Sequence, residues 1–290
     1  MSSVDPVVHA QPSEMPTTVR GVLRRQVRSE LRLVFRRRRN AAILCFLALI
    51  PVFIGIAVKV STPKSGDGPP FIFQVSGNGL FLVFTALAVG LPVFLPLAVA
   101  IVAGDAVSGE AGTGTLRYLL TVPVARSRLL LVKAAGALAY VAAAVAVIGI
   151  VGLITGGVLF GIHPITLLSG DTVPTIDGML RALGVAGYVF LDLVGLVAIG
   201  LFLSTLTEVP VAAMAATLGV TIVFAILDSV PQVGSLRSIL LTHHWQDFGE
   251  LLRQPPHLST LLPGIFIPLA YAAIFGSAAW ARITTMDVTA

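Results

Sequence analysis

A polar stretch from Ala103 to Arg128 separates two long apolar segments and carries residue types suited to contacting a partner. It contains an acid, Glu110, followed by glycines and threonines and then by Arg117. A stretch this polar does not enter a bilayer, although both of its neighbours are apolar enough to do so. The residues leave two interpretations open: a plain connecting turn, or an element that docks into a partner and passes displacement to both flanking segments.

Asp192 is the only ionisable residue near the middle of any long apolar segment. A charge at the centre of a bilayer is costly, so this side chain must face protein or water. Tyr188 lies one helical turn earlier, and this spacing predicts a hydrogen bond between the two side chains. Three roles remain open for Asp192: polar contact between helices, a place in a substrate pathway or gate, and proton coupling.

A third candidate is the set His243, Asp247 and Glu250, which share a face at helical spacing. Such side chains are able to ligate a metal ion, but the same spacing is typical of a solvated polar face. We expect the solvated face, with no metal. The surrounding stretch from Asp228 to Thr260 predicts short amphipathic or re-entrant helices, anchored at a membrane interface by Trp245.

The composition indicates that lipid surrounds these candidates. The chain has 290 residues, of which 56% are hydrophobic and 11% charged, and its mean hydropathy is +0.94. Soluble domains carry about 25% charged residues, so an ordinary water-soluble enzyme is excluded. The single cysteine, Cys45, excludes an internal disulfide and a cysteine-based zinc site.

Six apolar segments approach the length of about 20 residues that a helix needs to cross a bilayer. We therefore expect an all-α membrane protein with six transmembrane helices. The segments run over residues 41–58, 80–102, 134–160, 182–203, 211–227 and 261–281. The second contains Pro92 and Pro96, which predict a bend or break, either as a static kink or as a hinge.

Basic residues set the expected orientation. If the amino terminus is cytoplasmic, 14 of the 19 basic residues fall on the cytoplasmic side. This bias places both termini in the cytoplasm and accounts for the net charge of +5 without nucleic-acid binding.

The ends of the chain divide from the transmembrane domain, expected over residues 40–282. Residues 1–18 are typical of a disordered tail, and residues 283–290 form a short cytoplasmic tail. Residues 19–39 carry nine arginines opposite an apolar face, which predicts a basic amphipathic helix in contact with lipid headgroups. Two interpretations of its arginines remain open: they only set the orientation of the chain in the membrane, or they also contact a cytoplasmic partner.

The polar stretch after the second segment resembles the cytoplasmic loop of ABC-2 type transporter permeases. The resemblance extends to the architecture: a basic interfacial helix, six spans, a coupling helix after span two, and outer re-entrant helices before span six. The residues that match the loop motif are Glu110, Gly114, Thr115, Leu116, Arg117, Leu119, Leu120, Thr121, Pro123, Arg126, Leu129, Leu130 and Lys133.

This resemblance implies a permease subunit whose loop contacts an ATP-binding cassette ATPase. The sequence contains no Gly-x-x-x-x-Gly-Lys-Ser/Thr phosphate loop, so ATP and Mg²⁺ are expected on the partner, and this chain has no catalytic residue. Six spans are half of the usual twelve in this family, so the resemblance implies a dimer with a second copy of the chain or with a paralogous permease, in the plasma membrane and with export favoured. The coupling residues implied are Glu110, Gly112, Gly114, Thr115, Leu116, Arg117, Pro123 and Arg126.

Two other classes compete with this interpretation. An ion- or proton-coupled secondary transporter would depend on Asp192 alone. An intramembrane serine protease would need serine and histidine within the spans, but Ser108 lies in the loop and no histidine lies in an apolar segment. The transported substrate is not readable from the residues.

Overall fold

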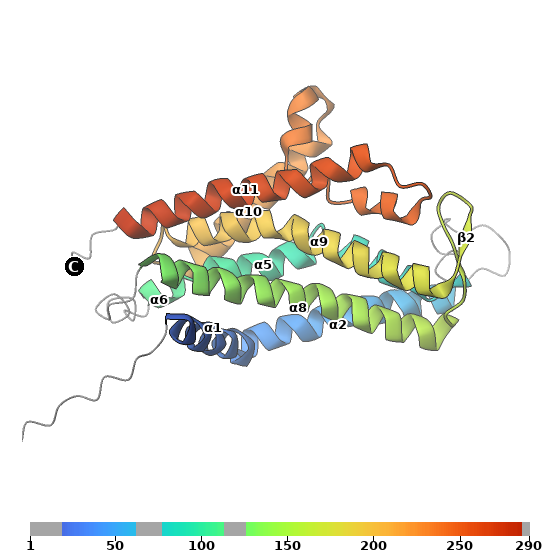
Figure 1. The fold of residues 1–290 in the computed structure, drawn as a ribbon, viewed down its shortest axis with the longest axis horizontal. Helices are drawn as coiled ribbons and strands as arrows, with labels where there is room; N and C mark the ends of the chain where they lie inside the picture. The colour runs from blue at the N-terminus through green and yellow to red at the C-terminus, as the bar shows by residue number, and fades with distance from the viewer. Residues whose placement is uncertain (1–18, 62–76, 113–125, 286–290) are drawn as a thin grey trace, which may run out of the picture.

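The computed structural model describes residues 19–61, 77–112 and 126–285, and this part of the chain is a bundle of helices (Figure 1). The first half of the chain supplies α1 (Val19–Arg36), α2 (Arg38–Ser61), α4 (Leu80–Gly90), α5 (Phe94–Asp105) and α6 (Ser108–Gly112). The second half supplies α8 (Arg126–Phe160), α9 (Thr175–Ser204), α10 (Pro210–Ser229) and α11 (Leu258–Thr285). A short hairpin of β1 (Ile165–Thr166) and β2 (Thr172–Val173) joins α8 to α9, and the 3-10 helices η1 (Pro231–Ile239) and η2 (Asp247–Leu252) follow α10.

Five of these helices are long and apolar enough to cross a membrane: α2, α8, α9, α10 and α11. The pair α4 and α5 makes a sixth if the two count as one bent span. The expected class, an all-α membrane protein, is therefore confirmed. The long helices run side by side, with α1, α6 and the carboxyl end of α11 at one end of the bundle and the β1–β2 hairpin at the other (Figure 1).

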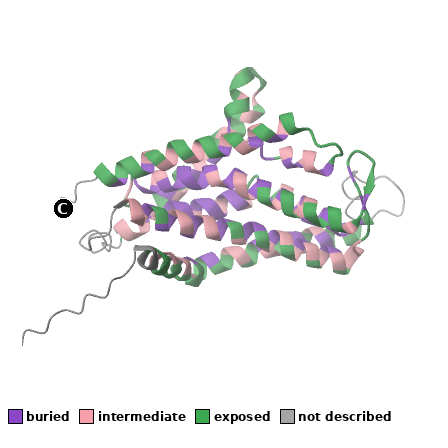
Figure 2. Ribbon diagram, in the orientation of Figure 1, coloured by how far each residue is buried: buried purple, intermediate pink, exposed green. Residues whose placement is uncertain are grey.

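α9 lies at the centre of the bundle. In its apolar stretch 67% of the residues are buried, against 17% in α10 and in α11. Figure 2 shows the buried positions gathered on the inner helices, while α11 is largely exposed, and η1 contains no buried residue. The exposed apolar surface of the outer helices is what lipid contact requires.

Glycines bring the central helices close together. A Cβ atom at Gly156 of α8 would lie 2.1 Å from the carbonyl oxygen of Gly79, and one at Gly200 of α9 would lie 2.8 Å from the Cβ of Ala103. A Cβ at Gly104 would lie 2.9 Å from the backbone nitrogen of Met214 on α10. Larger side chains at these positions would push α4 from α8, and α5 from α9 and α10.

The second apolar segment breaks at the first of its two prolines. α4 ends at Gly90, α5 begins at Phe94, and the two helices are bent by 56°. Pro92 lies in the break, where it removes a helical hydrogen bond. Pro96 lies in the first turn of α5, where a backbone N–H has no helical partner to lose. We therefore attribute the bend to Pro92, whereas Pro96 is compatible with the first turn of α5.

The helix expected over residues 19–39 is shorter than its charge pattern suggests, because α1 ends at Arg36 and α2 begins at Arg38. Asn40 explains the corner: its buried amide donates a hydrogen bond of 2.9 Å to the carbonyl oxygen of Val34 near the end of α1. At the other end of the chain α11 continues to Thr285, beyond the expected boundary at residue 282. The tail expected over residues 1–18 and the last five residues lie outside the described residues.

Candidate functional site

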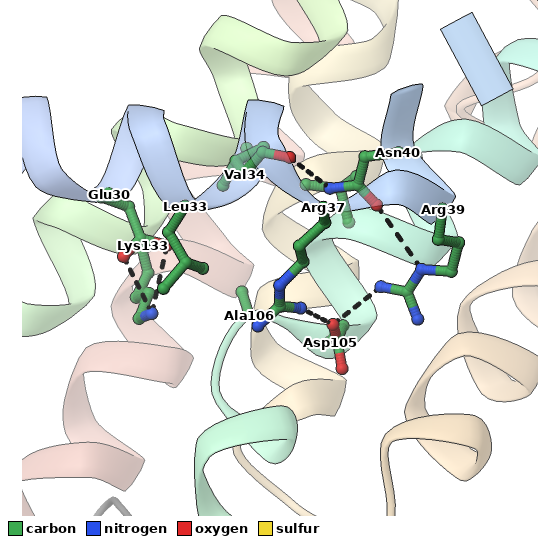
Figure 3. A pocket seen from close by; sticks show the side chains of 11 residues that line it. Glu30, Leu33, Val34, Arg37, Arg39, Asn40, Asp105, Ala106 and Lys133 are labelled. Carbon is green, nitrogen blue, oxygen red and sulfur yellow. Dashed lines mark hydrogen bonds and ion pairs between the residues drawn. The ribbon is translucent and has the colours of Figure 1, made fainter. Parts of the chain in front are cut away.

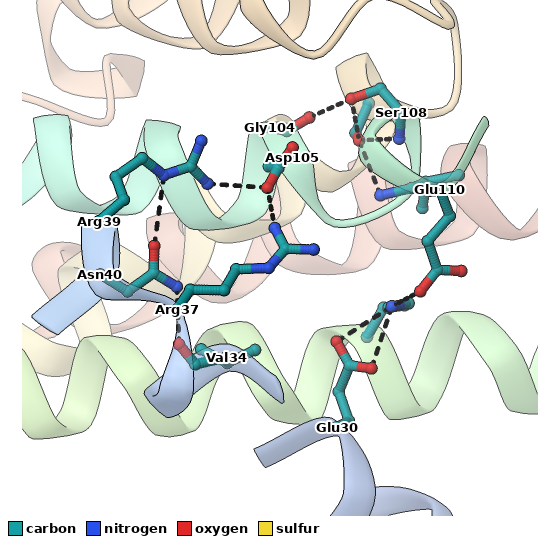
Figure 4. Close-up of polar contacts among 12 residues, drawn as sticks. Glu30, Val34, Arg37, Arg39, Asn40, Gly104, Asp105, Ser108 and Glu110 are labelled. Atoms are coloured by element: carbon teal, nitrogen blue, oxygen red, sulfur yellow. Dashed lines mark hydrogen bonds and ion pairs between the residues drawn. The ribbon is translucent and has the colours of Figure 1, made fainter. Parts of the chain in front are cut away.

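The α6 end of the bundle holds six charged side chains that we call the ionic cluster: Glu30, Arg37, Arg39, Asp105, Glu110 and Lys133 (Figure 4). Lys133 on α8 is its buried centre, with a side chain that is 3% exposed. Its ammonium group donates to both carboxylate oxygens of Glu30 on α1, at 3.1 and 3.0 Å, and to Glu110 on α6. A buried lysine needs such partners, because an unpaired charge there would be strongly unfavourable. Lys133 therefore joins α1, α6 and α8.

The second half of the ionic cluster consists of Asp105, Arg37 and Arg39, and it connects the end of α5 to the α1–α2 corner. Asp105 is the last residue of α5 and accepts hydrogen bonds from Arg39, at 2.7 Å, and from Arg37. These two arginines flank the corner between α1 and α2, so the carboxylate ties that corner to the end of the bent helix pair. Tyr140 of α8 supports the corner, since its hydroxyl donates a hydrogen bond of 2.8 Å to the carbonyl oxygen of Asn40.

The cavity between the two halves of the ionic cluster is small. It measures about 20 Å³ and is lined by Glu30, Arg37, Arg39, Asn40 and Lys133, among others (Figure 3). A single ordered water needs about 10–15 Å³, so this space fits one water and no larger ligand. The ionic cluster is a connection between helices and not a substrate pocket.

α1 lies against α8 through a glycine. A Cβ atom at Gly136 of α8 would come within 2.9 Å of the Cγ of Glu30 and 3.5 Å of Val34. Val34 is buried, while Arg28, Arg32 and the neighbouring arginines of α1 are exposed. The basic face of α1 is therefore free for headgroups or a partner while its other face packs onto the bundle.

α6 is held in place by α9 and α10. The hydroxyl oxygen of Ser204, at the end of α9, accepts hydrogen bonds from the backbone N–H groups of Val107 and Ser108 at 3.0 and 2.9 Å. At the other end of α6, a Cβ atom at Gly112 would lie 2.8 Å from the carbonyl oxygen of Glu208, just before α10. Gly112 therefore permits a close approach of α6 to the start of α10.

The structure describes three of the coupling residues named from the sequence. Glu110 was expected to face a partner, but its side chain is 15% exposed and turns to Lys133 within the chain. Gly112 is exposed, and Arg126 is the first residue of α8. Gly114, Thr115, Leu116, Arg117 and Pro123 lie outside the described residues, so their contact with an ATPase stays a prediction.

The predicted hydrogen bond between Tyr188 and Asp192 is wrong. The Tyr188 hydroxyl instead donates a hydrogen bond of 3.0 Å to the carbonyl oxygen of His244. The reason is tertiary: residues 240–252, which we call the cap, fold over α9 and offer a backbone acceptor. Gly264 of α11 makes room for this contact, because a Cβ atom there would lie 1.6 Å from the Tyr188 oxygen. Asp192 is fully buried, and in the described part of the chain neither of its carboxylate oxygens has a hydrogen-bond partner.

The three residues considered for a metal site have separate partners. His243 pairs with Asp228 at 2.5 Å, Asp247 with His244 at 2.7 Å, and Glu250 with Arg253 and His257 at 3.4 and 3.2 Å. Among the residues that the structure describes, no group of three acids, histidines or cysteines is arranged to hold a metal ion. The face is ion-paired and partly covered, where the sequence predicted a solvated one.

Trp245 also differs from expectation. It is 4% exposed and belongs, with Phe248 and Leu252 of the cap, to the buried apolar core, so it does not anchor the segment at a membrane interface. The expected short helices before α11 are present as η1 and η2, both of 3-10 type.

Several residues of the site escaped the sequence analysis: Glu30, Asp105, Ser204 and the pairing of Lys133. One signal was available for Glu30, which is the only acid among the nine arginines of residues 19–39. A lone acid on a basic helix indicates a specific cationic partner. Its partner lies 103 residues away on another helix, a distance that no local pattern spans.

Comparison with protein families places most of this architecture in one group. A family model described as a protein of unknown function, DUF2705, matches residues 48–289. The matched region includes α4 to α11 and most of α2, and therefore the cap and the Asp105, Glu110 and Lys133 part of the ionic cluster, while Glu30, Arg37 and Arg39 precede it. Among curated proteins, no sequence matches the chain. Because the family model covers well over half of its length, the chain belongs to the DUF2705 family.

Proposed function

We propose that this chain is the membrane-spanning permease subunit of an ATP-binding cassette transporter, driven by ATP hydrolysis on a separate ATPase subunit. In this proposal α4 and α5 count as one bent span, so the subunit has six. Both termini are cytoplasmic, two such subunits form a dimer in the plasma membrane, and the direction is export. The ATPase binds ATP and Mg²⁺.

The observation that carries the proposal is the position of Lys133 between Glu110 of α6 and Glu30 of α1. α6 is the short element that follows the bent span, and the loop motif resembling ABC-2 permeases begins within it. Any displacement of α6 acts on α1 and α8 through Lys133, and on the α1–α2 corner through Asp105. An ATPase that pushes at this end would therefore move several helices together.

The break at Pro92 supports the same proposal. α5 packs mainly against α9 and α10, and α4 packs mainly against α8 and α2, although α5 also contacts α8 and α2 and α4 also contacts α9. Because the two halves are joined at a break and not by a continuous helix, α5 is able to tilt with α6 while α4 keeps its main contacts. Alternating access requires such relative motion of one end of the bundle.

The experiment is to purify the affinity-tagged chain from its own cell membrane and to test whether an ATP-binding cassette ATPase is retained with it on the column. Retention of an ATPase is expected. Glu110→Ala and Arg117→Ala are expected to reduce retention, or to uncouple ATP hydrolysis from transport. Asp177→Asn is the matched control, because this exposed acid begins α9 at the opposite end of the bundle. Failure to retain any ATPase would refute the proposal.

A second candidate is an ion- or proton-coupled secondary transporter. The observation that favours it is the complete burial of Asp192 without a partner in the described part of the chain. This candidate needs no ATPase, so transport by the chain alone under an imposed pH gradient would select it.

A further inference from the structure

Asp192 lies on a stripe of α9 that the cap covers. Tyr188, Asp192 and Gly195 follow one another at helical spacing on one face of the helix. At one end of this stripe Tyr188 donates to His244 of the cap, and at the other end a Cβ on Gly195 would lie 3.0 Å from the Cδ1 of Leu241. The carboxyl group therefore lies between two points where α9 contacts the cap. α11 lies along the same stripe, since the Tyr188 oxygen occupies the space at Gly264 and a Cβ on Gly195 would also lie 3.0 Å from the carbonyl oxygen of Pro268.

In the described part of the chain a small number of polar contacts hold the cap in place, and one of them is a hydrogen bond of 2.9 Å from the backbone N–H of Leu168 to the carbonyl oxygen of Leu252. Arg181 of α9 donates to the carbonyl oxygens of Leu251 and, at 3.1 Å, of Arg253. Gln246 of the cap donates at 3.3 Å to the carbonyl oxygen of Ala88 on α4, close to the break in that span. The buried side chains of Trp245 and Phe248 fill the space beneath. Together these contacts leave Asp192 with no exposed surface.

In the described part of the chain, no cationic side chain hydrogen-bonds to Asp192. α9 packs against α4, α5, α8, α10, α11 and η2, and none of their described side chains hydrogen-bonds to this carboxylate. The charged group that acts on it most is another acid, Asp247, which pairs with His244 of the cap. The described titratable or charged side chains on the surrounding elements and the cap are Asp105, Arg128, Lys133, Tyr140, Asp228, His243, His244, Asp247, Glu250, Tyr271 and Arg282, with Asp177, Arg181 and Tyr188 on α9 itself.

The cations among these groups are engaged or distant. Lys133 is held by Glu30 and Glu110, and Arg181 is held by backbone oxygens of the cap region. Arg128 and Arg282 lie near the α6 end of their helices. An ionised carboxylate without hydrogen bonds or counter-charge is strongly disfavoured in such a place, whereas a neutral carboxylic acid is tolerated.

We propose that Asp192 is a proton-binding site, which holds its proton as a neutral carboxylic acid beneath the closed cap and releases it to water when the cap is displaced. The step is a simple dissociation: the O–H bond of the acid breaks, the carboxylate keeps the electron pair, and water accepts the proton. It needs no ATPase, so it holds whether or not the permease proposal does.

Unsatisfied polar atoms on the cap support displacement. In the described part of the chain, the hydroxyl of Thr242 and the indole nitrogen of Trp245 are buried without partners, like the two oxygens of Asp192. Buried polar groups without partners are unfavourable, and water entering on opening would satisfy them on both sides. The closed arrangement therefore favours hydration as soon as its few anchoring contacts are lost.

The first test is infrared spectroscopy of the full chain in lipid vesicles at neutral pH. We expect a band from a protonated carboxyl group that disappears in Asp192→Asn. Asp105→Asn is the matched control: Asp105 is also buried but is paired with two arginines, so its replacement should leave that band unchanged. If Asp192→Asn keeps every protonated-carboxyl band of the wild type, the proposal is overturned.

The second test needs no change at Asp192 and so remains decisive if Asp192→Asn fails to fold. Dicyclohexylcarbodiimide, which is lipid-soluble and reacts with protonated carboxyl groups, should modify Asp192 in the wild-type chain, as read by mass spectrometry of peptides. A water-soluble carbodiimide should modify it at least several-fold more in Arg181→Ala or Tyr188→Phe than in the wild type. Arg237→Ala, on exposed η1, is the control. Equal modification by the water-soluble reagent in all four proteins would refute the proposal that the closed cap keeps water away from Asp192.

Discussion

Lys133 and Asp192 are both buried ionisable side chains, but their surroundings are opposite. Lys133 is enclosed by two carboxylates that come from different helices, whereas Asp192 has no partner in the described part of the chain. A buried charge with complete pairing fixes its helices relative to one another. A buried acid without pairing is stable only in one protonation state. The comparison separates a region in which paired charges connect helices from a region in which a buried acid has no described partner.

The largest effect should come from Lys133→Met, which leaves Glu30 and Glu110 without the cation between them. We expect the free energy of unfolding to fall by about 3–5 kcal/mol, the usual result of breaking a buried ion pair on one side. Thermal melting in detergent measures it. Replacing both acids by glutamine in the Lys133→Met background should recover most of the loss, and Lys59→Met, at an exposed lysine, is the control. Full stability in Lys133→Met alone would mean that the ionic cluster does not connect the helices.

The next effect tests the region of the cap. Gly264→Ala places a Cβ atom 1.6 Å from the Tyr188 oxygen and should cost about 1–3 kcal/mol through overpacking. It should also increase modification of Asp192 by a water-soluble carbodiimide. Gly276→Ala, on the same helix, is the control, because no atom lies within 4 Å of its added Cβ. A destabilised Gly264→Ala protein with an unchanged Asp192 would separate the packing of α11 from closure of the cap.

A smaller effect is expected at the other half of the ionic cluster. Asp105→Asn removes the charge that Arg37 and Arg39 share, but their side chains are 39% and 43% exposed, so water screens the interaction. We expect a loss of about 1–2 kcal/mol that shrinks as salt is added, measured by melting at two ionic strengths. If Asp105→Asn lowers the free energy of unfolding as much as Lys133→Met does, burial does not determine which half of the ionic cluster contributes more stability.

The smallest effect on stability should come from Asp192→Leu. The predicted Tyr188 partner is absent, so this near-isosteric change leaves no buried group unpaired, and the free energy of unfolding should stay within about 0.5 kcal/mol or rise. The same melting assay measures it beside Lys133→Met. A decrease of several kcal/mol in the free energy of unfolding would mean that Asp192 has a hydrogen-bond partner. Asp192 and Lys133 would then both be paired buried groups.

The helices were predictable because they depend on local apolar length. Each of the six apolar segments lies within a described helix or, for residues 80–102, within the bent pair, and Pro92 marked the break. The surface of α1 was predictable for the same reason, since its charge pattern is local. Its end was not, because the corner depends on a hydrogen bond from Asn40 back to Val34.

The candidate site was predictable only in part. The sequence located Glu110 and Asp192 as unusual residues but did not find the pairing of Glu110 with Lys133, and it gave Asp192 a neighbour on its own helix. Both omissions have one cause: the partners come from chain segments far away in sequence, 23 residues for Lys133 and Glu110 and 56 for Tyr188 and His244. Helical spacing describes which residues share a face, and it does not describe what that face meets.

The anchors from α9 to the cap have a consequence for how this sequence is free to vary over evolutionary time. Arg181 and Tyr188 both donate to main-chain oxygens, which every amino acid supplies. Substitutions at 251 or 253 therefore keep the acceptors, while substitutions at Arg181 or Tyr188 remove the donors. Among homologues, selection should act on the two donors and on the room at Gly264, and the residues that supply the acceptors should drift without a matching change in α9.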